Sequence, residues 1–226
     1  MKNNAVAWAR LGAMYFEEHK YGHNPRPGGD PLRDARNAAQ RAIEINSQLS
    51  DGYYILALVY YYTEKDFESF HEIAKRAIEK NPYNGWILGD LGLWTYYSGD
   101  WERGKALIET ARAIYPDDPR WLDFADVLDH YRKGEYRDAK AAAHALELSQ
   151  NAMVQEVLAA TYARLGEIES AKKKVDEILV IHPELGANPR APFRARKIPA
   201  DLVGAIMDGL QKAGFNVRPA GEPPSK

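Results

Sequence analysis

A short sequence motif that ends in proline recurs along this chain at a nearly constant spacing. The stretches AKRAIEKNP, ETARAIYP and DEILVIHP end at Pro82, Pro116 and Pro183. Pro116 follows Pro82 by 34 residues, and Pro183 follows Pro116 by 67, one residue short of two further periods. A second marker, a glycine followed by an acidic residue, stands between these stretches at Gly99, Gly134 and Gly166. Spacing of this kind indicates stacked copies of one small structural unit.

Each copy has the pattern of two helices joined by a tight turn. Apolar residues recur at three- and four-residue spacing before each glycine and again after it, which marks one face of a helix. Glycine adopts the positive φ that a tight reversal needs, and proline ends the second helix. Small residues such as Gly12 and Gly104 stand where two helices must approach closely. A unit of this design and length resembles the tetratricopeptide repeat.

The resemblance implies an all-α fold, a tetratricopeptide-repeat α-solenoid wound as a right-handed superhelix. The array is predicted over residues 1–183, with about five repeats at 5–47, 51–84, 85–118, 120–150 and 152–183. A Gly- and Pro-rich insertion at 17–34 interrupts the first repeat, and we expect it to form a loop with a contact role. Residues 184–215 are predicted to be C-terminal capping helices, and residues 216–226 to be disordered.

Composition excludes several classes of function. A net charge of −2 and a pI near 6.3 predict neither nucleic-acid binding nor attraction to an anionic membrane. The chain has no cysteine, which excludes disulfides and thiol chemistry. No cofactor motif and no paired-carboxylate or Ser/His/Asp arrangement is legible, so we expect no enzyme, no catalytic residue and no cofactor. The cytoplasm is the default location for such a chain.

The fourth repeat departs from the pattern of the others. Asp123, Asp126 and His130 stand where the other repeats carry apolar residues, while the apolar spacing shifts to Trp121, Phe124, Ala125, Leu128 and Tyr131. One extra residue, such as Pro119, would rotate the helix by about 100° and explain the shift. The alternative is a metal or ligand site, since Asp123, Asp126 and His130 can share one helix face. The rotation is the favoured interpretation, and no metal site is predicted.

In a tetratricopeptide array the first helix of each pair lines the concave surface. That rule predicts a groove for a partner, rich in aromatic and aliphatic side chains, which favours an amphipathic helix or an apolar extended segment. The alternative is that several of these aromatics belong to the core between repeats. The predicted partner-binding residues are Phe16, Tyr62, Trp86, Tyr96, Tyr97, Trp121, Phe124, Tyr131, Arg132 and Arg164.

Several longer strings point to a narrower resemblance. HKYGHNPRP at 19–27, GDWERG at 99–104, YRKGEY at 131–136 and DGLQKAGF at 208–215 resemble the C-terminal repeat region of bacterial class III adenylate/guanylate cyclase-type proteins and winged-helix regulators. In that family the repeats follow a catalytic, TolB-like or DNA-binding segment and serve as sensory or assembly modules. The resemblance implies a regulatory role and carries over no catalytic residue.

These observations lead to two hypotheses of function. The first is a scaffold that binds a protein or peptide in its groove, as a regulatory module of a larger signalling system in the cytoplasm. The second is a self-associating sensory module, which would form a homo-oligomer or hold a small apolar ligand between helices. An exposed groove aromatic favours a foreign partner, whereas one covered by residues 216–226 or by a second copy favours self-regulation.

Overall fold

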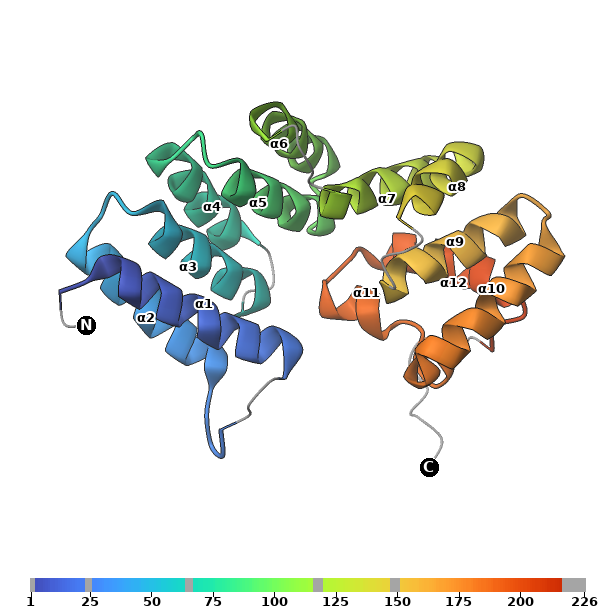
Figure 1. Ribbon diagram of the computed structural model, residues 1–226, viewed down its shortest axis with the longest axis horizontal. Coiled ribbons are helices and arrows are strands. Elements are labelled where there is room, and N and C mark those ends of the chain that lie inside the picture. The colour runs from blue at the N-terminus through green and yellow to red at the C-terminus, as the bar shows by residue number, and fades with distance from the viewer. Residues whose placement is uncertain (1–2, 23–25, 64–66, 116–119, 147–150, 217–226) are drawn as a thin grey trace. The chain divides into compact units, whose positions relative to one another are not determined.

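The computed structural model describes residues 3–22, 26–63, 67–115, 120–146 and 151–216 (Figure 1). The described residues contain helices and no strand, which confirms the all-α prediction. The helices are α1 (Ala5–Tyr21), α2 (Pro31–Ile45), α3 (Ser50–Thr63), α4 (Glu68–Lys80), α5 (Gly85–Tyr97), α6 (Trp101–Ile114), α7 (Asp123–Lys133), α8 (Tyr136–Ala145), α9 (Ala152–Arg164), α10 (Ile168–Ile181), α11 (Ala191–Ala195) and α12 (Ala200–Lys212). Short 3₁₀ turns precede α7 and follow α10, as η1 (Arg120–Leu122) and η3 (Pro183–Gly186).

The chain forms two compact units. The first unit holds residues 1–95 and 106–116, and the second holds residues 96–105 and 117–226. The helices from α1 to α10 follow one another as successive pairs, which span residues 5–45, 50–80, 85–114, 123–145 and 152–181. The last two residues of α5 belong to the second unit, together with the first turn of α6.

Side-chain caps fix where several helices begin. Asn4, Asp30 and Asn151 each stand just before a helix and accept a hydrogen bond from a backbone N–H of its first turn, at 3.0 Å in every case. Pro31 follows Asp30 as the first residue of α2, where its missing N–H costs nothing. Because the first N–H groups of a helix lack internal partners, these local contacts set the boundaries.

The predicted glycine turns are confirmed. Gly99, Gly134 and Gly166 have φ of 95°, 77° and 78°, which places each in the left-handed region between the two helices of a pair. Gly104 shows the predicted close approach, because a Cβ there would lie 2.5 Å from the backbone nitrogen of Tyr96. Any larger residue at this position would push α6 away from the end of α5.

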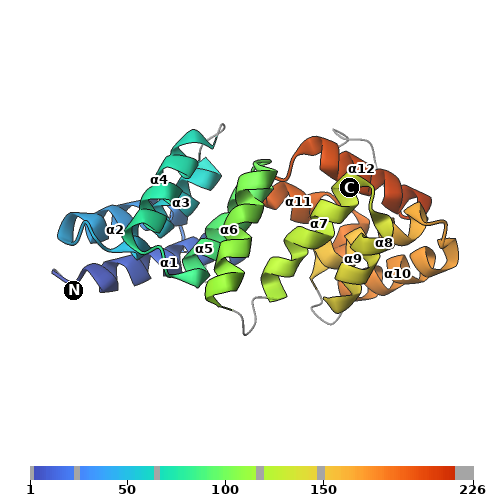
Figure 2. The same cartoon turned by 90° about the horizontal axis from the view of Figure 1, so that it is seen from above.

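In the first unit the two members of a helix pair have different surroundings. Residues 53–59 of α3 are all buried, whereas α4 buries only the stripe of Phe70, Ala74 and Ala77. The first helix of the pair therefore packs on several sides and the second on one. Figure 2 shows α1 and α2 side by side, with α3 and α4 next to them. Gly12 permits this packing, since a Cβ there would lie 3.2 Å from Ile55 and 3.3 Å from the Ala35 carbonyl.

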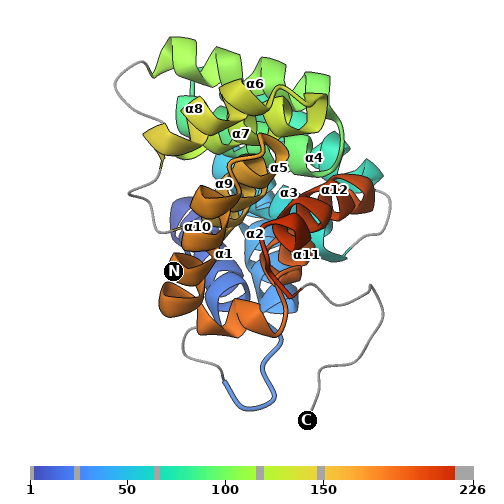
Figure 3. The ribbon, with the colours of Figure 1, turned by 90° about the vertical axis from the view of Figure 1, so that its right-hand side faces the viewer.

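In the second unit α9 is the central helix. It packs against α8, α10 and α12 (Figure 3). Its residues 153–161 are all buried. α12 buries the predicted apolar stripe of Leu202, Val203, Ile206 and Leu210 and is followed by Gly214 with φ of 89°. Docking on α9 gives α12 the position expected of a helix that covers the end of an array.

Some predicted boundaries differ from the structure. α1 continues to Tyr21 and α2 begins at Pro31, so the connection in the first repeat spans 22–30 rather than 17–34. In the fourth repeat the shifted apolar face is confirmed for Phe124, Ala125, Leu128 and Tyr131, which are buried, but not for Trp121, which is 38% exposed. Pro119, offered as the cause of the shift, lies outside the described residues, and so do residues 217–226 of the predicted disordered tail.

Candidate protein-binding surface

The predicted groove residues divide by burial. Five are buried at helix interfaces, namely Phe16, Tyr96, Tyr97, Phe124 and Tyr131. Tyr62, Arg132 and Arg164 are half-buried, while Trp86 and Trp121 are 55% and 38% exposed. Phe16, Tyr62 and Trp86 lie in the first unit and the other seven in the second. Burial assigns the first five side chains to core packing and leaves Trp86 as the most accessible aromatic of the set.

In the first unit, Trp86 stands beside a carboxylate held by two donors. The Tyr54 hydroxyl donates to Asp90 Oδ2 at 2.7 Å, and Trp94 Nε1–H donates to the same oxygen at 2.9 Å. The Trp86 ring meets the Tyr54 ring edge-on, with centroids 5.3 Å apart. α3 supplies Tyr54 and α5 supplies the other three residues, so two first helices of successive pairs build this site.

Aromatic rings continue from Trp94 toward α1. The Trp94 ring lies 5.6 Å from that of Tyr62, and the Tyr62 ring lies 5.6 Å from that of Phe16. Lys20 Nζ lies 5.7 Å from the centroid of the Trp94 ring, within the range of a cation–π contact. Phe16 and Trp94 are buried, so these rings pack α1, α3 and α5 together beneath the more accessible Glu17, Lys20, Trp86 and Asp90. We call this region the α1/α3/α5 face. We define it by Glu17, Lys20, Tyr54, Trp86, Asp90 and Trp94.

Acidic side chains outnumber basic ones on this face. Burial raises the pKa of Asp90, and Glu17 raises it further, while the hydrogen bond from Tyr54 and the charge of Lys20 lower it. Burial also raises the pKa of Tyr54 well above its ordinary value, with a contribution from Asp90. Tyr54 is therefore a neutral donor at every physiological pH. Asp90 is a half-buried carboxyl group whose charge is costly without a cationic partner.

In the second unit, another carboxylate accepts hydrogen bonds from three cationic side chains. Asp129 is buried and accepts hydrogen bonds from Lys105, Arg132 and Lys133 at 3.3, 2.7 and 2.7 Å. Burial alone would raise its pKa, but these three donors outweigh burial and hold the pKa well below its ordinary value. The Arg132 guanidinium also lies 5.0 Å from the centroid of the Trp101 ring. The predicted groove residue Arg132 is thus committed to an internal network that joins α6 to α7.

Arg164, another predicted groove residue, holds the capping helix. Its guanidinium donates to the Ala205 carbonyl at 2.8 Å, and the Tyr131 hydroxyl donates to the same oxygen at 2.9 Å. Burial raises the pKa of Tyr131 to about 12, so its hydroxyl stays protonated. A Cβ at Gly209 would lie 2.7 Å from the Tyr131 oxygen, so glycine is needed there for α12 to dock.

One arginine of the first-repeat insertion, Arg26, contacts both flanking helices. Arg26 pairs with Glu18 of α1 at 3.2 Å and with Asp34 of α2 at 2.9 Å, and its guanidinium lies 4.6 Å from the centroid of the Tyr15 ring. These contacts bridge the two helices that the insertion connects. Arg26 therefore ties the described residues before α2 to both helices.

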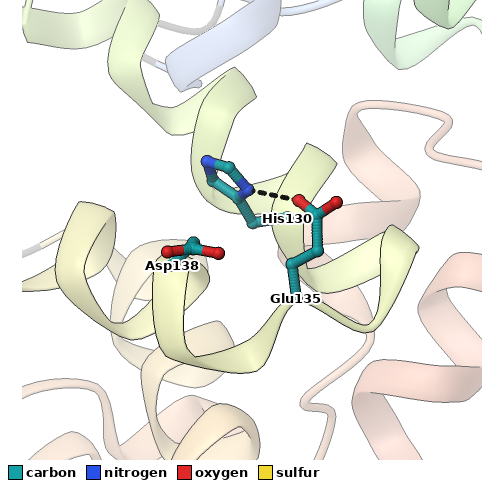
Figure 4. Close-up of side chains that lie close together, drawn as sticks. All are labelled: His130, Glu135 and Asp138. Atoms are coloured by element: carbon teal, nitrogen blue, oxygen red, sulfur yellow. Dashed lines mark hydrogen bonds and ion pairs between the residues drawn. The ribbon is translucent and has the colours of Figure 1, made fainter.

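One group of side chains has the composition of a metal site. Ligand atoms of His130, Glu135 and Asp138 all lie within 4.8 Å of one another, and His130 Nδ1 lies 2.7 Å from Glu135 Oε2 (Figure 4). Both carboxylates are exposed, and such acidic groups are common without an ion. Asp123 and Asp126, suggested by the sequence as ligands with His130, are not members of this group.

Sequence reasoning missed the two carboxylates that organise these networks. Asp90 is the one charged residue in α5, within the apolar stretch 86–97. Asp129 is likewise the buried acid of α7. A charge inside an otherwise apolar helix predicts a buried polar contact, because an unpaired charge is too costly to bury. That signal was available for Asp90, but its partner Tyr54 is 36 residues away in the chain.

Comparisons with known proteins agree on the fold. No protein-family model and no curated protein sequence matches the chain. Among solved structures it is similar to PilW, a type IV pilus biogenesis factor, with a TM-score of 0.64 and 15% identity over 92% of both chains. It is similar to Pseudomonas aeruginosa PilF, with a TM-score of 0.61 and 18% identity over 92% of this chain and 90% of PilF. It is also similar to TTC0263, a tetratricopeptide-repeat protein of Thermus thermophilus, with a TM-score of 0.58 and 18% identity over 90% of this chain and 99% of that one.

The fold is that of an all-α repeat protein built from helix pairs. Its similarity to TTC0263, together with the helix pairs and their glycine turns, makes it a tetratricopeptide-repeat solenoid. None of the described helices combines the length and the apolar character that crossing a bilayer demands.

Proposed function

We propose that this chain is a protein-interaction scaffold, without enzymatic activity, that binds a helix or peptide on the α1/α3/α5 face of its first unit. The proposal rests mainly on the exposure and the fixed position of Trp86. Its side chain is 55% exposed, yet its ring rests against Tyr54, whose hydroxyl is held by Asp90. A fixed, exposed tryptophan on rigid helices is the typical energetic centre of a protein interface.

The fold supports a binding role. Helical repeats offer extended surfaces and bind partners through residues on rigid elements. One similar solved structure is a chain of the APC/C Cut9–Hcn1 hetero-tetramer, with a TM-score of 0.65 and 15% identity over 93% of this chain and 40% of that chain. The biological context we infer is a regulatory role in a larger signalling system, which rests on the sequence resemblance, and a cytoplasmic location, which is the default for such a chain.

The test is a selection of peptides from a random displayed library on the immobilised full chain. We expect enriched peptides to bind Trp86→Ala about tenfold or more weakly, because truncating a central aromatic anchor typically costs that much. The matched control is Tyr115→Ala, which removes an aromatic that is 63% exposed after the end of α6. Peptides that bind wild type, Trp86→Ala and Tyr115→Ala equally would contradict the proposal.

Self-association is the alternative hypothesis, and the same variant distinguishes it. If the α1/α3/α5 face joins two copies of the chain, light scattering over a concentration series will show an oligomer that Trp86→Ala disrupts. The scaffold proposal expects wild type and variant to have equal mass at every concentration.

A further inference from the structure

We propose that the partner of the α1/α3/α5 face presents a basic side chain, lysine or arginine, that binds Asp90 Oδ1 while its alkyl stem lies against Trp86. This inference rests on the proposed function and specifies the chemistry of the partner. We expect an apolar residue of the partner before the basic residue and another after it.

The hydrogen bonds of Asp90 leave one oxygen available. Tyr54 and Trp94 both donate to Oδ2, and no described residue donates to Oδ1. Two donors on one oxygen fix the orientation of the carboxyl group, so its second oxygen is held ready for a ligand. Asp90 is half-buried, and Oδ1 is not among the buried polar atoms that lack a partner, so solvent reaches it.

Charge on the face favours a cation. Glu17 of α1 and Asp51 of α3 are exposed, and their charges act on Tyr54 together with that of Asp90. Lys20 is the opposing cation, and its Nζ lies over the Trp94 ring without forming an ion pair with Asp90 among the described residues. With Asp51 beside the face, three carboxyl groups stand against the one ammonium of Lys20, and complementary charge is how interfaces select partners.

The rings around Asp90 suit a basic side chain in particular. Lysine and arginine bury their methylene stems on apolar surface while the charged group stays hydrated or paired. Trp86, which is 55% exposed, supplies that surface, its ring rests on the buried Tyr54 ring, and aromatic faces attract cations. A sodium ion or a neutral apolar residue would use only one of these two features.

The experiment compares two capped tripeptides on the full chain. Acetyl-leucyl-lysyl-leucine amide is titrated against its norleucine counterpart, which keeps the stem and removes the charge. The readout is the nuclear magnetic resonance signal of the Trp94 indole N–H, which donates to Asp90. We expect a saturable shift with the lysine peptide, and at least about tenfold weaker binding of the norleucine peptide.

Two variants separate the role of Asp90 from an effect on folding. Asp90→Asn should weaken the lysine peptide about tenfold, whereas Lys20→Met, which removes the competing cation, should tighten it. Equal affinity for both tripeptides, or a Lys20→Met variant that binds the lysine peptide more weakly, would overturn the inference. The proposed function is judged separately, because Trp86-dependent peptides can emerge from the library without any basic residue.

Discussion

Glu156 allows the packing of the second unit to be tested through pH. Its side chain is fully buried in α9, and neither carboxyl oxygen has a hydrogen-bond partner among the described residues. Glu156 lies one turn before Ala160, whose Cβ would be 2.7 Å from a Cβ at Gly209 of α12. Burial raises the pKa of Glu156 from 4.5 to about 9, so the folded chain holds this acid protonated at neutral pH.

The sign of the effect follows from the two pKa values. Below the ordinary pKa both the folded and the unfolded chain carry the proton, and Glu156 imposes no penalty. As pH rises, the unfolded chain loses the proton while the folded chain keeps it, so stability falls by about 1.4 kcal/mol per pH unit until about pH 9. At pH 7 the penalty is about 3 kcal/mol. Glu156→Gln keeps the shape, cannot ionise and should remove the penalty.

The assay is urea denaturation followed by circular dichroism at several pH values. We expect Glu156→Gln to be more stable than wild type by about 3 kcal/mol at pH 7 and by less than about 1 kcal/mol at pH 5. The control is Glu169→Gln on α10, whose side chain is 90% exposed and should give no pH-dependent difference. If the stabilities of wild type and Glu156→Gln run parallel from pH 5 to pH 8, Glu156 is not a buried unpaired acid.

The close helix contacts and the ion pairs determine the effects of substitutions at Gly104, Asp129 and Arg26. Gly104→Ala should destabilise the chain by about 1–3 kcal/mol through its clash with the backbone of α5, whereas Gly204→Ala, with nothing within 4 Å of its Cβ, should stabilise α12 by about 0.5–1 kcal/mol. Thermal unfolding will compare them, and equal effects would refute the packing argument. Asp129→Asn should cost about 3–5 kcal/mol in urea denaturation at pH 7, because it leaves three cations without their carboxylate. Since the pKa of Asp129 is lowered, the wild-type contribution should persist down to its ordinary pKa of 3.8 and fall below it. Arg26→Ala should speed amide hydrogen exchange in residues 26–30, while Arg33→Ala should not; equal exchange in both variants would show that Arg26 does not hold the loop.

The repeat architecture was predictable because its determinants are local. Gly99, Gly134 and Gly166 mark turns that need positive φ, and each has it. Gly104 is predictable as a point of close approach because a small residue recurs at the equivalent position of other repeats. The insertion was expected to begin at residue 17, but α1 continues to Tyr21. It ends at Gly22, which caps the helix in the left-handed conformation.

The binding surface was predictable only in part. In α5 nearly every residue from Ile87 to Tyr97 is apolar, so the spacing does not tell which face meets solvent. Tyr96 is buried because residues distant in sequence pack over it, whereas Trp86 is left exposed. The pairing of Asp90 with Tyr54 depends on the packing of α3 against α5, which no local pattern encodes.

We propose above that the α1/α3/α5 face binds the partner. The most direct test is to titrate a library-selected peptide into the isotopically labelled full chain and map the amide signals that move. We predict that the largest changes fall in α1, α3 and α5, with the Trp86 and Trp94 indole signals among them. Changes confined to the exposed faces of α2 and α4, or to the second unit, would show that the partner binds elsewhere.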